Sequence, residues 1–382
     1  MIIQKINKIM IKWCVKCVLP NTRPNLIIDK DGICNACKFH ERKKIKVNWN
    51  KQKRKLIKIF NSIKKKSKNN FDCLIPVSGG KDSIWQVVEC LKYGLKPLTV
   101  TYKSPGRNFY GEQNLKKLIS LGVEHIDYTV NPKTEAYFMI KTLKEKGSTA
   151  IPMHISIFNL PMIIAEKFKI PLIVFGENPA SEYGFDRTQE HKINKFDNKW
   201  IKRYAPINKT NLSYWKDKYL KDKILMSYKT PNDFKRIKVL FLGEYIKWSP
   251  QNSLKVAKKC GFIYPSNPKT GYYNYADIDC DFISIHHYLK WFKFGFTRLF
   301  DNLSIEIRNK KMTRSRAIKI ICKNFNNIKP KEDIKNFCKF TNISQAEFDK
   351  FAEKFRNKNI WKKNKFGNWE IKNFITSNFI WK

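Results

Sequence analysis

Short apolar runs recur along the middle of the chain and alternate with amphipathic stretches. The runs predict β-strands at residues 73–78, 97–103, 125–130, 171–177 and 237–245. The intervening stretches predict helices at 83–93, 112–121 and 156–168. Strands that alternate with helices in this way indicate a parallel sheet covered on both faces. The expected fold class is α/β, with a doubly wound parallel sheet.

The two ends of the chain have different patterns. Leu56, Ile59, Phe60 and Ile63 follow helical spacing among lysines, which predicts a surface helix over about 51–65. Beyond about residue 255 the strand signal fades, and helical stretches with many aromatic residues follow. We therefore expect three parts: a double-CxxC module at 12–45, the α/β domain at 50–255, and a helical C-terminal substrate or partner region at 256–382.

The loops after the predicted strands are the places to search for a ligand site. In doubly wound sheets, ligands bind beyond the carboxyl ends of the strands, near the point where the strand order reverses. The pattern therefore points to loops 78–83, 102–111, 176–187 and 244–250.

The composition changes this picture little. The formal charge is +44, but the lysines are spread along the whole chain and form no long basic tail. We interpret them as solvated surface residues and expect no nucleic-acid partner. No apolar run reaches the roughly 18 residues of a membrane span, and charges interrupt the N-terminal stretch. We expect a cytoplasmic protein without membrane insertion, whose ten cysteines act as metal ligands or core thiols.

Two CxxC pairs near the N-terminus predict a metal site. They comprise Cys14, Cys17, Cys34 and Cys37. Two such pairs can close a tetrahedral shell of four thiolates around Zn²⁺, which leaves no open position and favours a structural role. An iron–sulfur cluster is the other possible interpretation.

The stretch "SGGKDS", residues 78–83, lies between the first predicted strand and its helix. Gly79 and Gly80 let backbone amides form an anion-binding turn, to which the following helix dipole adds. Ser78 and Ser83 can donate to phosphate oxygens, Lys81 supplies a positive charge, and Asp82 can hold Mg²⁺. The Gly-x4-Gly-Lys spacing of a P-loop is absent.

This stretch resembles the PP-loop of the ATP-pyrophosphatase superfamily, whose members cleave ATP between its α- and β-phosphates. Further segments resemble the N-acetyl sugar amidotransferases of bacterial surface-polysaccharide biosynthesis. They are the double CxxC, "PLIVFGENPASEYG", "FLGEYIKW" and "FGFTRLFDNLSIEIRNKKMTRSRAI". The resemblance implies adenylation of a sugar acetamido group with release of pyrophosphate, and then displacement of AMP by ammonia to give an acetamidino sugar. It also implies ATP and Mg²⁺ as cofactors, a nucleotide-linked acetamido sugar as substrate, and ammonia from a separate glutaminase subunit through a barrel-like conduit subunit.

Several residues are candidates for roles in this chemistry. For catalysis we select Lys81, Asp82, Glu177 and Asn178, although Asn178 followed by proline could simply turn the chain. Tyr102 joins the loop residues as a nucleotide contact. The candidates for substrate binding are Arg107, His154 and Tyr183. Arg107 could equally be a solvated loop residue, and His154 a structural histidine. His286 and His287 lie about 100° apart on a helix, which favours one buried and one exposed ring over a ligand pair.

Two other classes of protein fit parts of the sequence. A tRNA thiolase can combine CxxC pairs with this loop, and the positive charge suits RNA. Cys73 and Cys90 lie in a predicted strand and a predicted helix, however, and do not look like a catalytic pair. A zinc-ribbon nucleic-acid-binding protein with a vestigial loop is the third class, and the intact "SGGKDS" argues against it.

Overall fold

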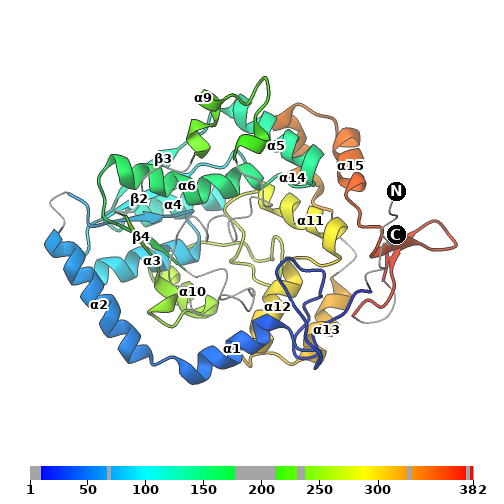
Figure 1. The fold of residues 1–382 in the computed structure, drawn as a ribbon, viewed down its shortest axis with the longest axis horizontal. Helices are drawn as coiled ribbons and strands as arrows, with labels where there is room; N and C mark the ends of the chain where they lie inside the picture. Colours follow the sequence, from blue (N-terminus) through cyan, green and yellow to red (C-terminus); the bar gives the residue numbers. More distant parts are fainter. Residues whose placement is uncertain are drawn as a thin grey trace, which may run out of the picture.

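The structure is a computed structural model, and it describes residues 10–66, 70–176, 212–229, 237–324, 329–375 and 379–381. A five-stranded parallel sheet forms its centre, in the order β3-β2-β1-β4-β5 (Figure 1). The strands are β1 (Cys73–Pro76), β2 (Pro97–Tyr102), β3 (Glu124–Tyr128), β4 (Leu172–Phe175) and β5 (Lys238–Phe241). The predicted α/β fold with a doubly wound parallel sheet is confirmed, and each predicted strand is present with shorter bounds.

Helices cover both faces of this sheet. One face carries α2 (Trp49–Lys66), α3 (Lys81–Lys92), α4 (Phe109–Ile119) and α10 (Pro250–Lys259). The other carries α5 (Pro132–Lys146), α6 (Ile151–Lys167) and the short helices η2 (Leu212–Trp215), α9 (Asp222–Leu225) and η3 (Met226–Tyr228). The apolar strand residues are therefore buried on both sides, as the unbroken apolar runs predict.

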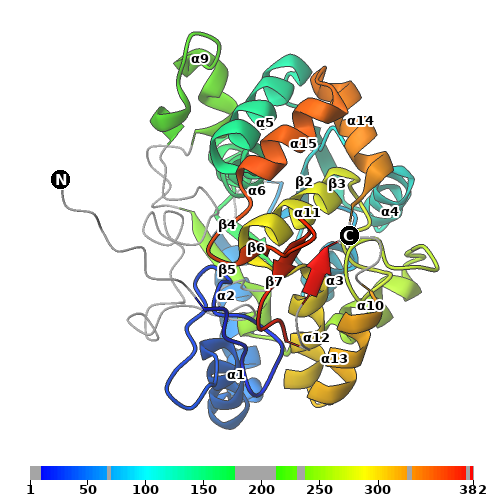
Figure 2. The same ribbon diagram turned by 90° about the vertical axis from the view of Figure 1, so that its right-hand side faces the viewer.

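The helices of the C-terminal region lie beyond the carboxyl ends of the strands (Figure 1). They are α11 (Phe282–Phe294), α12 (Arg298–Arg308), α13 (Arg314–Lys323), α14 (Lys331–Thr341) and α15 (Gln345–Lys354). The predicted helical C-terminal region is thus confirmed, but it ends in a small antiparallel sheet that the sequence pattern did not reveal (Figure 2). Its strands are β6 (Trp361–Lys363), β7 (Trp369–Ile371) and β8 (Phe379–Trp381). Strands of three residues are too short to show a period of two.

The N-terminal module packs against the C-terminal helices, although the two are far apart in the sequence (Figure 2). A single hydrophobic core joins Ile11 and the four cysteines to Trp291, Phe300 and Trp361. Helix α1 (Asn35–Lys46) begins inside the module, and α2 follows it and leads into the sheet. The short helix η4 (Leu242–Glu244) comes directly after β5 and precedes α10. The N-terminal module and the C-terminal region therefore share one core.

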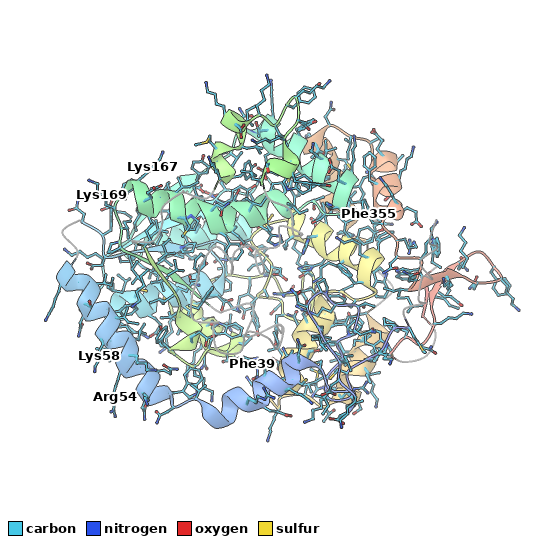
Figure 3. The ribbon with its side chains drawn as sticks, viewed as in Figure 1. Phe39, Arg54, Lys58, Lys167, Lys169 and Phe355 are labelled. Atoms are coloured by element: carbon cyan, nitrogen blue, oxygen red, sulfur yellow. The ribbon has the colours of Figure 1, made fainter. Side chains whose placement is uncertain are left out.

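Basic side chains occupy separate parts of the periphery. Arg54 and Lys58 extend from α2, whereas Lys167 and Lys169 lie at the end of α6 (Figure 3). All four are exposed. Among the described residues, none of the helices combines the length and apolar character that a membrane span requires.

Candidate active site

A pocket of about 360 Å³ lies at the carboxyl ends of the parallel strands. Four loops that the sequence selects contribute to it, through Ser78, Tyr102, Gly176 and Trp248. The loop after β1 and Gly176 after β4 meet where the chain switches from one side of the sheet to the other. The strand-end rule therefore finds this half of the pocket from sequence alone.

The "SGGKDS" turn forms one wall of the pocket. Gly79 has a φ of +84°, and a Cβ at this position would lie 2.9 Å from the carbonyl oxygen of Gly111. Only glycine therefore fits here. The amide of Ser78 donates to Ser83 Oγ at 3.0 Å, and the amide of Gly80 donates to Ser78 Oγ at 3.2 Å. The turn brings the N-terminus of α3 to the pocket, where its free amides suit an anion.

Asp82 is fixed at the edge of this wall. Its Oδ2 pairs with the Lys81 ammonium, and its Oδ1 accepts a hydrogen bond from Trp248 Nε1 at 3.0 Å. Lys81 Nζ also lies 5.8 Å from the Trp248 ring centroid and 5.9 Å from that of Tyr275. The Lys81 side chain is 7% exposed and that of Asp82 is 27% exposed. The lysine is therefore enclosed, whereas the carboxylate remains accessible from the pocket.

The opposite wall comes from the C-terminal region, and sequence reasoning missed it. It contains Tyr275, Asp277, Asp279, Arg298 and Asn302. Burial raises the pKa of Asp279, and a hydrogen bond with Ser78 opposes this effect. A second carboxyl group thus faces the phosphate-binding turn. Residues 265–281 are an irregular segment without periodicity, so no pattern could place them.

Asp277 and Arg298 form an ion pair in this wall. Arg298 Nε donates to Asp277 Oδ2 at 2.9 Å, and the Thr270 hydroxyl donates to the same oxygen at 3.0 Å. Burial alone would raise the pKa of Asp277, but Arg298, His287 and Thr270 hold it well below its usual value. Asp277 therefore carries a negative charge beside the pocket.

Helix α12 connects this pocket to the cysteine module. Arg298, Asn302 and Ile305 line the pocket at spacings of four and three residues, so they share one face of the helix. Asp301 and Ser304 lie on another face: Asp301 Oδ1 accepts from Arg23 Nε at 2.8 Å, and Ser304 Oγ accepts from the Val18 amide at 3.4 Å. The module therefore holds the helix that forms part of the pocket.

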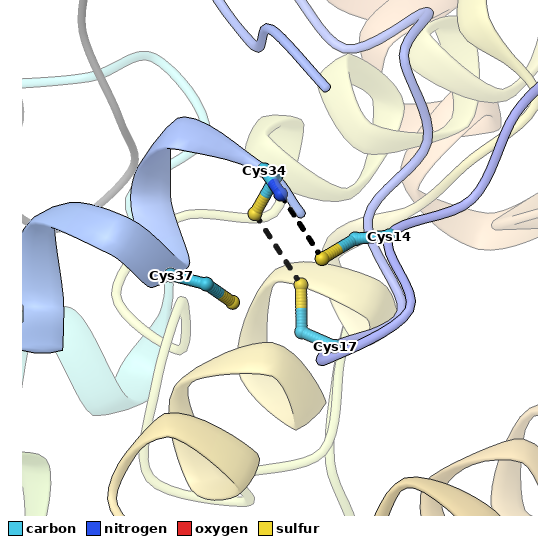
Figure 4. A group of neighbouring side chains, drawn as sticks. All are labelled: Cys14, Cys17, Cys34 and Cys37. Atoms are coloured by element: carbon cyan, nitrogen blue, oxygen red, sulfur yellow. Dashed lines mark hydrogen bonds between the residues drawn. The ribbon is translucent and has the colours of Figure 1, made fainter. Parts of the chain in front are cut away.

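The four cysteines of the module form a compact cluster (Figure 4). All four are buried, and their sulfur atoms lie within 4.8 Å of one another. Cys17 Sγ lies 3.7 Å from Cys34 Sγ, and the Cys34 amide donates to Cys14 Sγ at 3.3 Å. Arg314 Nε on α13 donates to the carbonyl oxygens of Cys14 and Cys17, at 3.3 and 3.0 Å. Four converging thiols at these distances can hold a metal ion.

Replacing Arg23 with Met should lower the free energy of unfolding by about 3 kcal/mol, because it removes one of the two ion-pair partners of the buried Asp301 carboxylate and leaves Lys290 as the other. Denaturant unfolding measures this. Lys16→Met is the matched control, since its pair with Glu41 is exposed on both sides. Equal unfolding midpoints for the two variants would contradict a structural role for the buried pair.

The pocket wall that comes from the C-terminal region lies in a segment that matches a family model. Residues 269–375 match the model described as "LPS biosynthesis protein WbpG-like, C-terminal domain". This segment is therefore similar to that domain, and we refer to residues 269–375 as the WbpG-like domain. Over this segment, the match supports the resemblance to proteins of bacterial surface-polysaccharide biosynthesis that the sequence motifs indicate. The WbpG-like domain begins just before Thr270 and supplies Asp277, Asp279 and α12 to the pocket.

Comparison with solved structures returned weak matches. NMN synthetase from Francisella tularensis is 11% identical, over 79% of this chain and 96% of that one, with a TM-score of 0.34. NH3-dependent NAD synthetase from Campylobacter jejuni is 15% identical, over 49% of this chain and 100% of that one, with a TM-score of 0.29. A predicted subunit of tRNA methyltransferase from Methanocaldococcus jannaschii is 18% identical, over 49% and 75%, with a TM-score of 0.27. Likeness of this degree carries no argument about activity. No curated protein matches the chain.

The predicted contact residues Tyr102 and Arg107 lie at the edge of the WbpG-like domain. Tyr102 lines the pocket, and its hydroxyl donates to the buried Glu135. Arg107 instead lines a neighbouring cavity of about 230 Å³, and both of its terminal nitrogens donate to Asp127 at 2.6 Å. Its backbone bridges to Cys280 of the WbpG-like domain. A nucleotide role for Tyr102 and a substrate role for Arg107 stay predictions.

His154 contacts the WbpG-like domain through a cluster of rings. Its ring centroid lies 5.3 Å from that of His286, which in turn lies 5.3 Å from that of His287. The sequence predicts one buried and one exposed ring. His287 is indeed buried, but His286 is partly buried and not exposed. Among the described residues, His154 does not line the active-site pocket. A substrate role for His154 stays a prediction.

Acid should destabilise the protein through this cluster. Burial first, and then the neighbouring groups His287 and Lys290, lower the pKa of His154 from 6.5 to about 4. Between these two pH values His154 binds a proton in the unfolded chain but not in the folded one. Its contribution to the free energy of unfolding is therefore fully present above pH 6.5 and is lost as the pH falls towards about 4. His154→Leu should reduce the slope of unfolding free energy against pH in that window by up to about 1.4 kcal/mol per pH unit. An unchanged slope would contradict this assignment.

Three further candidates, Glu177, Asn178 and Tyr183, lie outside the described residues. Gly176, which directly precedes Glu177, lines the pocket. Their predicted roles in catalysis and substrate binding stay predictions.

Proposed function

We propose that this protein is an ATP-dependent sugar amidotransferase that converts the acetamido group of a nucleotide-linked sugar into an acetamidino group. One observation carries the proposal: the "SGGKDS" turn and the WbpG-like domain line the same pocket. A turn suited to phosphates and a domain similar to one described for LPS biosynthesis therefore face one another across a single pocket.

In the first step, the amide oxygen of the sugar attacks the α-phosphorus of ATP. The bond from that phosphorus to the β-phosphate oxygen breaks, pyrophosphate leaves, and the amide nitrogen loses its proton. The product is an imidate joined to AMP, which is a far better electrophile than the amide. The amides of the turn, Ser83 and the Lys81 ammonium would hold the pyrophosphate as its charge develops.

The pocket also suits Mg²⁺. Asp82 is partly exposed to the pocket, and Asp279 lines the same space, so two carboxylates offer the oxygen ligands that this ion prefers. When bound, Mg²⁺ neutralises negative charge on the phosphates. Asp82 is the principal candidate because both of its oxygens are already oriented by Lys81 and Trp248.

In the second step, ammonia displaces AMP from the imidate carbon. Following the resemblance, ammonia would come from a separate glutaminase subunit through a barrel-like conduit subunit. The acetamidino sugar would serve LPS, O-antigen or flagellin glycan biosynthesis, and the enzyme would act in the cytoplasm. The four cysteines would bind Zn²⁺ in a closed structural shell, since their geometry offers four sulfur ligands.

The test combines purified protein, ATP, Mg²⁺ and ammonium chloride with a panel of nucleotide-linked acetamido sugars, and mass spectrometry identifies the products. We expect an amidine, AMP and pyrophosphate with at least one sugar. AMP formation only with tRNA would favour the tRNA-modifying alternative instead. That alternative has less support, because no cysteine is among the described residues that line the pocket.

A further inference from the structure

A second cavity, of about 510 Å³, lies within the WbpG-like domain beside the active-site pocket. The loop 268–271, His287 of α11, Thr297 before α12 and the start of α14 surround it. It contains no part of the "SGGKDS" turn. Phosphates held at the turn would therefore lie in the active-site pocket and not in this cavity.

The two cavities share a thin polar partition. Asp277 lines the active-site pocket, whereas Thr270 and His287 line the second cavity. The Thr270 hydroxyl donates to Asp277 Oδ2 at 3.0 Å, and His287 Nε2 lies 3.5 Å from the same oxygen. These side chains, in contact, separate the second cavity from the pocket.

The partition suits a small molecule that donates hydrogen bonds. His287 is 8% exposed, and neither of its ring nitrogens makes a hydrogen bond within the described part of the chain. Burial lowers the pKa of His287, so the ring is neutral and has an acceptor nitrogen, and Asp277 offers a carboxylate that is paired with Arg298. The Asp277 carboxylate, which is paired with Arg298, and the neutral imidazole can both accept hydrogen bonds from ammonium or ammonia. Of the three lysines among the described residues that line the cavity, Lys269 pairs with Asp281 and Asp333, and Lys329 pairs with Asp349.

The adenylated sugar also needs protection from water, because hydrolysis of the imidate would restore the amide and waste the ATP. An entrance for ammonia that is separate from the opening used by ATP and the sugar would allow the pocket to remain closed around them. The second cavity has the position that such an entrance needs.

We propose that the second cavity is the entrance for ammonia, which crosses the partition formed by Thr270, His287 and Asp277; this inference rests on the proposed function. Ammonium gives one proton to the acceptor nitrogen of the His287 ring, which passes it to water in the second cavity, and the neutral ammonia donates its lone pair to the imidate carbon. The carbon–oxygen bond breaks, and AMP leaves with that electron pair and the original amide oxygen. One hydrogen of the ammonia moves to the sugar nitrogen, which leaves the product as an amidinium cation.

The test narrows the second cavity without touching the active-site pocket. Thr297 lines this cavity, and its side chain makes no capping hydrogen bond. Thr297→Trp should raise the KM for ammonium at least about tenfold, because a group that does not fit a pocket commonly changes kcat/KM by that factor or more. The KM values for ATP and sugar should stay unchanged. Lys331→Trp, at the exposed rim of the cavity, is a second variant with the same expected effect. Ser315→Trp on α13 is the control, since Ser315 is exposed and lines neither cavity.

A second readout separates failure of this inference from failure of the proposed function. Without ammonium, the sugar should drive exchange of labelled pyrophosphate into ATP equally in all four proteins. Absence of exchange in the wild type overturns the proposed function and the entrance with it. Exchange in all four, with the wild-type KM for ammonium in both cavity variants or an equal rise in the control, overturns the entrance alone.

Discussion

Replacing Asp82 with Asn should lower the rate of amidine formation by about 10²–10³-fold, the usual loss when one preorganised charge is removed from a reacting centre. Asparagine can still accept the hydrogen bond from Trp248, so the turn should keep its shape, but the negative charge offered to Mg²⁺ disappears. Initial rates at saturating ATP and sugar measure the effect.

The matched control for this change is Asp222→Asn. Asp222 is 79% exposed and pairs with Lys216 at the surface, away from the pocket. It should leave the rate unchanged, and both variants should keep the unfolding midpoint and the metal content of the wild type. An Asp82→Asn enzyme that works at close to the wild-type rate would remove this carboxylate from the mechanism.

Replacing Cys17 with Ser should abolish binding of the Zn²⁺ that we propose for the four cysteines, and should lower the free energy of unfolding by more than about 4 kcal/mol. The effect is large because Cys17 is fully buried and belongs to the core shared with Trp291 and Phe300. The variant keeps three thiols and one hydroxyl in that core without a metal ion to bind them. Metal analysis together with denaturant unfolding measures both consequences.

Cys322→Ser is the control, because Cys322 is exposed on α13 and lies outside the cluster. It should keep the zinc and the wild-type stability. Since α12 lies between the module and the pocket, Cys17→Ser should also weaken sugar binding more than ATP binding. A variant without zinc but with wild-type stability would show that the four thiols do not serve the fold.

The sequence predicts the central sheet and one wall of the pocket, because these depend on local patterns. Apolar runs identify β1 to β5, and the strand-end rule selects the loops that contain Ser78, Tyr102, Gly176 and Trp248. The cysteine spacing likewise identifies the cluster. In each case the signal is contained in a few neighbouring residues.

The other wall depends on contacts between distant segments. Asp277 and Asp279 lie in an irregular loop that reaches the pocket only because α11 and α12 pack beyond the sheet. The attachment of the cysteine module to α12 joins residues that are 278 positions apart, as in the pair of Arg23 and Asp301. Periodicity carries no information about such pairings, so a sequence alone could not place this wall of the pocket.

The central claim is that the amide oxygen of the sugar is adenylated, and an isotope experiment tests it most directly. An acetamido sugar labelled with heavy oxygen in its acetyl carbonyl is incubated with the enzyme, ATP, Mg²⁺ and ammonium chloride, and the products are weighed by mass spectrometry. The account predicts that the label appears in AMP and is absent from pyrophosphate and from the amidine. Unlabelled AMP, or label in pyrophosphate, would contradict it.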